Sequence, residues 1–173
     1  MPDHPFTITP ADSPVDLEAV RTLCWAYRRV LLNNSEIDRT LTETFYPVPK
    51  YDALMQDLPQ LHARPRGIIL LARDPHGTPV GCGMTHPLDD TSVEVKRVFV
   101  DPAARGTGLG KTLCLALIDQ ARADGYARVL LDTSRSLPAA GPLYLALGFA
   151  ERGPYQPIPD SALPHLRFFE FTL

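Results

Sequence analysis

The segment that most constrains the fold is Arg-Gly-Thr-Gly-Leu-Gly-Lys-Thr, residues 105–112. It separates an apolar run over 93–100 from an amphipathic run over 109–123. This order predicts a strand, a glycine turn and the start of a helix. The glycines let backbone N–H groups approach a ligand closely, and the helix N-terminus adds partial positive charge. The segment therefore predicts a site for a phosphate group.

The chain before this segment predicts an antiparallel meander. Three apolar runs, over 67–73, 79–86 and 91–100, are separated by short turn signals such as Asp-Pro-His-Gly at 74–77. Their connections are too short for the crossover that a parallel pair needs. We therefore expect these three strands to pair with one another in sequence order.

The chain after this segment predicts a change to parallel pairing. A helix over 108–124 leads to a strand over 127–132, and a strand–helix–strand connection of that length implies a right-handed crossover. Further elements are expected as strands at 6–9, 149–152 and 166–172 and as helices at 15–32, 51–58 and 139–147, with a loop over 35–50. The sum is a single α/β (α+β) domain over 1–173, with a mixed sheet of about six or seven strands.

Composition narrows the functional class. The net charge of -3 argues against a nucleic-acid binder, which usually carries a basic face. No apolar run approaches the roughly 18 residues of a membrane helix. The three cysteines, Cys24, Cys82 and Cys114, are scattered within apolar patterns and predict buried thiols in a reducing, cytoplasmic compartment. The five histidines lack paired ligand spacing, so we expect no metal site.

Two nucleotide-binding motifs come close to the glycine segment without matching it. A nucleotide P-loop, G-x-x-x-x-G-K-[ST], fits Gly110, Lys111 and Thr112 but needs a glycine where Arg105 stands. The dinucleotide fingerprint G-x-G-x-x-G fits Gly106 and Gly108 but needs a third glycine at position 111. An antiparallel meander before the loop is also the wrong organisation for a nucleotide hydrolase.

A third pattern, [Gln/Arg]-x-x-Gly-x-[Gly/Ala], is matched in full by Arg105, Gly108 and Gly110. In this the chain resembles the GCN5-related N-acetyltransferases (GNAT), a family that binds acetyl coenzyme A. The run Val-Lys-Arg-Val-Phe-Val-Asp-Pro at 95–102 is similar to the family's central strand. The run from Ala139 to Phe149 is similar to its second conserved helix, with Leu-Tyr before Gly-Phe.

The resemblance implies acetyl coenzyme A as the cosubstrate, without a metal. In the family, backbone N–H groups of the glycine loop hold the pyrophosphate, and the end of the central strand pairs with the pantetheine arm. Arg105 and Lys111 could also neutralise phosphate charge. The implied cofactor-binding core covers about 93–150. Its contact residues are Val98, Phe99, Val100, Arg105, Gly106, Thr107, Gly108, Leu109, Gly110, Lys111 and Thr112.

The resemblance also implies two catalytic residues. Tyr144 stands where the family has a tyrosine near the cofactor sulfur, and a phenol is protonated at neutral pH and can donate to a departing thiolate. Glu94 lies on the central strand, where some relatives use a glutamate as general base, often through water. Alternation along the strand predicts that Glu94 shares a face with Val98 and Val100.

The acceptor site is implied only in outline. The family builds it from the first helices and the C-terminal segment, which here means about 15–60 and 153–165. Acidic and aromatic side chains there would suit a cationic amine, and the candidates are Trp25, Tyr27, Glu36, Asp38, Glu43, Phe45, Tyr46 and Tyr155. We expect a primary amine of a small molecule or peptide as the acceptor. Homodimers are common among such relatives.

Three functional hypotheses follow from these residues. The first is an N-acetyltransferase that works by direct transfer in a ternary complex, because Cys114 lies in an apolar helical pattern and predicts no acetyl-cysteine intermediate. The second is a noncatalytic acyl coenzyme A-binding sensor with the same fold. The third is a P-loop-type nucleotide-binding protein, which would bind ATP in the presence of magnesium.

Overall fold

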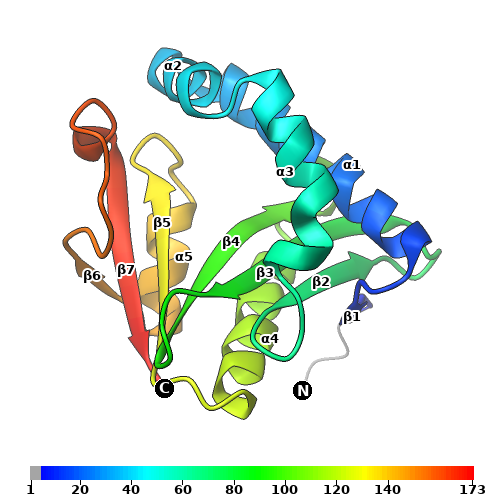
Figure 1. Ribbon diagram of the computed structural model, residues 1–173. Helices are drawn as coiled ribbons and strands as arrows, with labels where there is room; N and C mark the ends of the chain where they lie inside the picture. Colours follow the sequence, from blue (N-terminus) through cyan, green and yellow to red (C-terminus); the bar gives the residue numbers. More distant parts are fainter. Residues whose placement is uncertain (1–4) are drawn as a thin grey trace.

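The computed structural model describes residues 5–173 as one seven-stranded mixed sheet with helices on both faces (Figure 1). The strand order is β1-β2-β3-β4-β5-β7-β6. The strands are β1 (Thr7–Pro10), β2 (Ile68–Arg73), β3 (Pro79–Pro87), β4 (Ser92–Val100), β5 (Arg128–Ser134), β6 (Ala150–Arg152) and β7 (Leu166–Thr172). The sheet confirms the predicted mixed α/β fold.

The α-helices are α1 (Pro14–Asn34), α2 (Glu36–Phe45), α3 (Val48–Leu61), α4 (Leu109–Ala123) and α5 (Ala140–Leu147). Two short 3₁₀ turns, Pro102–Ala104 and Leu163–His165, complete the described elements. The pairing confirms the expected topology: β2, β3 and β4 are antiparallel neighbours, and β4 pairs with β5 in parallel across the α4 crossover.

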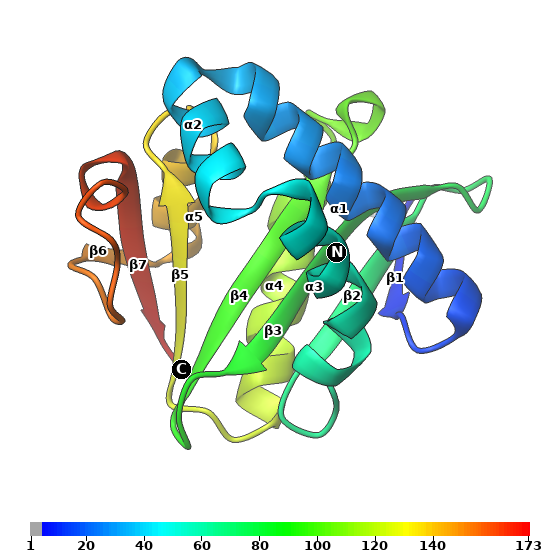
Figure 2. The same cartoon turned by 45° about the horizontal axis from the view of Figure 1, so that its top comes forward.

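The sheet separates two hydrophobic cores. On one face, Leu113 and Leu117 of α4 pack against Val93 and Val129 of the central strands. On the other face, α1 and α3 pack against strand residues such as Leu71, and α1 lies across the strands in Figure 2. Helices α1, α3 and α4 each place apolar residues on the sheet, as their spacing predicts.

The prediction of a loop over 35–50 is wrong, because most of this segment forms helices α2 and α3. Ser35 caps α2, and its hydroxyl oxygen accepts a hydrogen bond from the backbone N–H of Asp38 at 3.0 Å. Acidic Glu36 and Asp38 in the first turn also complement the helix dipole. Ile37, Leu41 and Phe45 also recur at helical spacing, so both the cap and the apolar pattern of α2 were present in the sequence.

The prediction that Glu94 shares a face of the sheet with Val98 and Val100 is also wrong. The β3–β4 register shifts between Cys82 and Met84, so Arg97 and Val98 together face one residue, and Arg97 has φ 53. This β-bulge inverts the alternation of side chains. Val98 and Val100 consequently pack on the α4 side with Val93 and Val95, whereas Phe99 packs with α1.

The parallel pair at the centre of the sheet opens partway along its length. The pairing of β4 with β5 covers only Ser92–Glu94 and Arg128–Leu130. Beyond those residues the two strands diverge toward their C-terminal ends, as Figure 1 shows. Functional residues at the ends of both strands therefore lie beside an opening in the sheet, which is where ligands bind in many α/β folds.

Candidate functional site

The glycine segment forms a tight loop at the start of α4. Gly106 and Gly108 have φ values of 76° and 83°, a left-handed conformation that glycine adopts without steric cost. Within the part of the chain that the structure describes, the backbone N–H groups of residues 106–111 donate to no protein acceptor. Six amides at a helix N-terminus make a concave site for an anion such as pyrophosphate.

The side chains of this loop divide into three groups. Leu109 is 1% exposed and packs in the core, so only its backbone faces the loop. Thr107 and Thr112 donate hydroxyl hydrogen bonds to the carbonyl oxygens of Ala104 and Gly108, at 2.6 and 3.1 Å. The charged side chains of Arg105 and Lys111 are exposed. Arg105 Nε donates to the carbonyl oxygen of Val100 at 3.4 Å, and the remaining donors of Arg105 and the Lys111 ammonium can meet phosphate oxygens.

The strand residues expected beside the cofactor lie on opposite faces of the sheet. Val98 and Val100 are partly buried on the α4 side, and a Cβ added at Gly110 would lie 3.8 Å from Val100. The end of β4 is thus adjacent to the amide loop. Phe99 instead stacks on Tyr27 at a centroid distance of 5.5 Å, on the other face.

Tyr144 projects from α5 into an aromatic cluster. Its ring lies 5.6 Å from those of both Phe149 and Phe169, and the residue is 8% exposed. Its hydroxyl forms no hydrogen bond with residues 5–173 and is not fully enclosed, because every fully buried polar side-chain atom there has a partner. Burial, with smaller contributions from Cys114, Tyr27 and Asp132, raises the pKa of Tyr144 well above its ordinary value. The phenol is therefore protonated at neutral pH.

Glu94 is the most heavily hydrogen-bonded carboxylate at the strand opening. It is 1% exposed, and it accepts hydrogen bonds from Tyr155 and from Gln156, the latter at 3.1 Å. His86 Nε2 lies 2.7 Å and Lys96 Nζ 3.2 Å from Glu94 Oε1.

Opposing effects act on the Glu94 carboxyl. Burial alone would raise its pKa, but the hydrogen bonds from His86 and Tyr155 and the charge of Lys96 outweigh burial and lower the pKa to about 2. Glu94 is therefore ionised at neutral pH.

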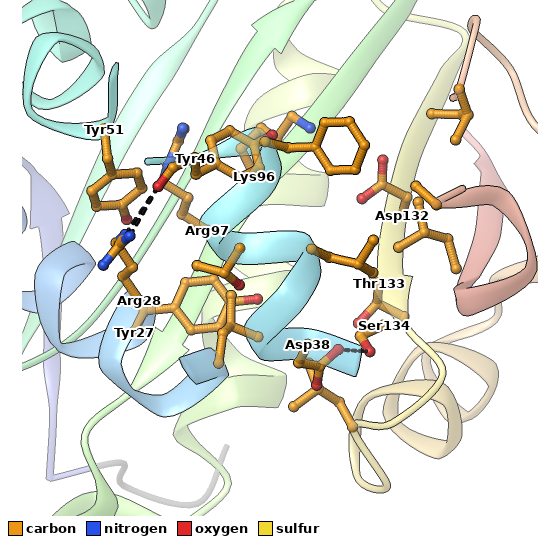
Figure 3. A pocket seen from close by; sticks show the side chains of 18 of the residues that line it. Tyr27, Arg28, Asp38, Tyr46, Tyr51, Lys96, Arg97, Asp132, Thr133 and Ser134 are labelled. Atoms are coloured by element: carbon orange, nitrogen blue, oxygen red, sulfur yellow. Dashed lines mark hydrogen bonds between the residues drawn. The ribbon is translucent and has the colours of Figure 1, made fainter. Parts of the chain in front are cut away.

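A cavity of about 360 Å³ lies beside the strand opening, between the first helices and the C-terminal segment. Figure 3 shows β4 and β5 on two of its sides, with Lys96 and Arg97 from β4 and Asp132, Thr133 and Ser134 from β5. Its size is that of a small-molecule site. Glu94 does not line the cavity; it lies behind Lys96 and Gln156, which do.

Some of the acceptor-side candidates predicted from the sequence line the cavity, and the others lie outside it. Tyr27, Asp38, Phe45 and Tyr46 line the cavity. Trp25 packs edge-on against Tyr51 at 4.9 Å, and Tyr155 bonds Glu94. The other two, Glu36 and Glu43, are exposed on α2. Half of the proposed set thus lies where a substrate could touch it.

Several cavity residues escaped the sequence reasoning. In the sequence, Lys96 and Arg97 belong to a strand motif without a predicted role, and the bulge that turns Arg97 has no clear sequence signal. Gln156 lies in the proline-rich segment, which was assigned to the acceptor side only as a whole. A search for charged residues on the strand before the glycine segment could have found Arg97.

The three cysteines are buried and free, as their apolar context predicts. Burial raises the pKa of Cys114 to about 12, so this thiol is not a ready nucleophile. Among residues 5–173, no helix is both long enough and apolar enough to cross a membrane.

Comparison with known proteins identifies the class of this fold and site. Residues 34–149 match the model of the acetyltransferase (GNAT) family. An uncharacterized N-acetyltransferase from Schizosaccharomyces pombe is 32% identical over 158 residues, which are 90% of each chain. The chain therefore belongs to the GNAT family and is an N-acetyltransferase, and the P-loop hypothesis is excluded.

Solved structures support the same assignment. A candidate acyl-CoA N-acyltransferase from Klebsiella pneumoniae has a TM-score of 0.70 and 29% identity, with 99% of each chain covered. An N-acetyltransferase from Thermoplasma acidophilum, solved in complex with coenzyme A, has a TM-score of 0.69 and 17% identity, with 97% of this chain and 99% of that chain covered. Acetyl-CoA-dependent acetyl transfer is general for this family.

Proposed function

We propose that this enzyme transfers the acetyl group of acetyl coenzyme A directly to a primary amine of a small molecule or peptide, within a ternary complex. One observation carries the proposal. A loop of unpaired amides at the start of α4 and a cavity of small-molecule size both adjoin the opening between β4 and β5. Donor and acceptor could thus approach the opening from its two sides.

The residues of the loop fit the donor. The amides of residues 106–111 suit a pyrophosphate, and Arg105 and Lys111 add charge next to them. Val98 and Val100, at the end of β4 where the parallel pairing has stopped, lie on the way from the loop to the opening. A pantetheine arm could add to this free strand edge by main-chain hydrogen bonds.

Tyr144 is the proposed general acid. When the amine nitrogen attacks the thioester carbon, the C–S bond breaks and the thiolate takes a proton. The Tyr144 hydroxyl is protonated, and no group among the described residues competes for its proton. The charge of the cavity residue Asp132 contributes to the raised pKa of Tyr144, which supports a position of the Tyr144 hydroxyl close to the acceptor cavity.

Glu94 is the proposed base, acting through water. Attack requires a neutral amine, so the acceptor ammonium must first lose a proton. Glu94 is ionised and lies one residue layer behind the cavity wall, which suits a water-mediated path. Its pKa of about 2 makes it a weak proton acceptor, so we expect a modest catalytic contribution.

Thiol release from acetyl coenzyme A, measured with a panel of amines, tests the proposed function. Turnover with at least one amine, together with its acetylated product in the mass spectrum, is the expected result. A noncatalytic sensor would bind acetyl coenzyme A and release no thiol with any amine. An acetylated protein intermediate trapped without acceptor would contradict direct transfer.

A further inference from the structure

The wall of the cavity carries more positive than negative charge. Four basic side chains and two acidic ones line it, namely Arg28, Lys50, Lys96 and Arg97 against Asp38 and Asp132. A bare amine is a cation, and this excess of positive charge would repel it. The charge balance therefore suits an acceptor that also carries an anionic group.

Most of these charges already have protein partners. Asp38 accepts hydrogen bonds from Ser134 and from Asn34, the latter at 2.7 Å. Lys96 lies 3.2 Å from Glu94, and Arg28 donates from Nε and Nη2 to the carbonyl oxygen of Tyr46 at 3.1 and 3.0 Å. These groups shape the wall and have less capacity to bind a substrate.

Lys50 lies over the Tyr46 ring at 5.4 Å, which leaves two oppositely charged residues on the wall without an ion pair, Arg97 and Asp132. Among residues 5–173, Arg97 forms no ion pair with an acidic side chain, and the Asp132 carboxylate forms no hydrogen bond or ion pair, although burial raises its pKa and the charge of Lys96 acts against that rise. Figure 3 shows Arg97 on the β4 side of the cavity and Asp132 on the β5 side. Both side chains are only partly buried at the cavity wall, so a ligand that carries both charges can reach and pair with both.

The backbone at Arg97 supports a functional role for this side chain. Its φ of 53° lies in the left-handed region, which is uncommon for a residue with a side chain. It occurs in the β4 bulge, at the wall of the cavity. Strained positions of this kind cluster at ligand sites, where the surrounding fold maintains them.

We propose that the acceptor is an amino carboxylate, whose ammonium group pairs with Asp132 and whose carboxylate pairs with Arg97. This inference rests on the proposed function. A guanidinium can hold a carboxylate by two parallel hydrogen bonds. The rest of the wall is largely apolar, so the acceptor also carries an apolar or aromatic group; the apolar lining includes Tyr27, Leu31, Leu41, Phe45, Leu137 and Ile158.

Matched amines test the substrate class on the wild-type enzyme. Phenylalanine is compared with phenylalaninamide and 2-phenylethylamine, and 6-aminohexanoate with hexylamine, which covers a longer spacing between the two charges. We expect kcat/KM for at least one carboxylate to exceed that of its matched neutral amines by about tenfold or more. Equal or faster turnover of the neutral amines in both series would overturn the proposal.

Arg97→Gln tests the proposed partner of the carboxylate. The substitution should raise KM for the preferred amino carboxylate by about tenfold or more and leave kcat/KM for its neutral analogue close to wild type. Arg122→Gln removes an exposed cation of α4 that pairs with Asp119 at 2.8 Å, and it serves as the control. An equal loss for the charged and neutral members of a pair would assign Arg97 a purely structural role and contradict the inference.

The two levels of the proposal fail in different ways. Turnover confined to amines without a carboxylate would overturn the acceptor class and leave the N-acetyltransferase function intact. Acetyl coenzyme A binding without thiol release across the whole panel would overturn the proposed function itself, and the acceptor class with it. If Arg97→Gln fails to fold, the wild-type panel decides the substrate class without it.

Discussion

At the scale of single residues, the hydroxyl of Tyr144 is the proposed proton donor to the thiolate. Its ring is buried beside Phe149 and Phe169, and the hydroxyl forms no hydrogen bond with another group among residues 5–173. Tyr144→Phe keeps the ring packing and removes only the proton donor. We expect kcat to fall by about 10²-fold or more, with the Kd of acetyl coenzyme A near wild type. Steady-state kinetics and calorimetric titration measure the two quantities.

Tyr126→Phe provides a matched control for the tyrosine prediction. Tyr126 is likewise 8% exposed, but its hydroxyl donates to the carbonyl oxygen of Arg66 at 2.8 Å. Its loss should lower the free energy of unfolding by about 1 kcal/mol without changing kcat. If both variants lost stability alike and neither lost turnover, Tyr144 would be a packing residue.

Glu94 should make the stability of the folded state depend on acid pH. Its pKa falls from an ordinary 4.5 to about 2 on folding, so the folded state binds the proton more weakly. The stabilisation is complete above pH 4.5 and is lost as the pH falls toward 2, and its size is on the order of 3 kcal/mol. Glu94→Gln should remove this pH-dependent part, measured by urea unfolding between pH 2.5 and 7 as compared with wild type.

The same variant tests the catalytic role of Glu94. Because the carboxylate is ionised throughout the working range, Glu94→Gln should lower kcat by a similar factor at every pH from about 6 to 9. A wild-type acidic limb in that range that disappears in the variant would contradict the low pKa. Unchanged kcat would remove Glu94 from the deprotonation step.

At the scale of elements, the loop before α4 combines a left-handed backbone that favours glycine with a proposed binding role. Gly106 and Gly77 have φ values of 76° and 85°, and an added Cβ meets nothing within 4 Å at either position. Alanine at either site should therefore cost about 1 kcal/mol of stability through backbone strain alone. Only Gly106→Ala should also weaken acetyl coenzyme A binding, because Gly77 lies in the β2–β3 turn. Equal affinities in the two variants would separate the loop from the donor site.

The elements with strong periodicity could be predicted from the sequence, and those set by tertiary contacts could not. The stripe of Leu109, Leu113 and Leu117 predicts α4, and the continuous apolar runs predict the central strands. The α2 helix depends on the Ser35 cap and its neighbours. The β4 bulge at Arg97 arises from pairing with β3, and alternation along one strand contains no information about its partner.

The candidate site shows the same division. The donor loop is one continuous segment, so its pattern and spacing could be recognised in the sequence, although its binding role stays a prediction. The cavity wall instead comes from α1, α2, α3, β4, β5 and the segment around 156–166. A site assembled from distant segments depends on packing. The pairing of Glu94 with Tyr155, 61 residues away, could not be predicted from either residue alone.

At the scale of the whole molecule, a few polar contacts join the N-terminal helices to the central sheet beside the cavity. Asp38 of α2 accepts a hydrogen bond from Ser134 at the end of β5, although 96 residues separate them in sequence. Asn34 reaches both Asp38, at 2.7 Å, and the carbonyl oxygen of Ser136, at 3.1 Å. Asp38 is 3% exposed, so its hydrogen bonds have little competition from water.

A double-mutant cycle on Asp38→Ala and Ser134→Ala tests whether this contact maintains the cavity. Neighbouring partners in one network should show a coupling of about 1 kcal/mol in the free energy of unfolding. Each single variant should raise the acceptor KM, since both residues line the cavity, while the Kd of acetyl coenzyme A remains unchanged because the donor loop is a separate segment. Additive effects on unfolding would show that α2 and β5 contribute to stability independently of this hydrogen bond. An equal loss of donor and acceptor affinity would show that the variants change more than the cavity.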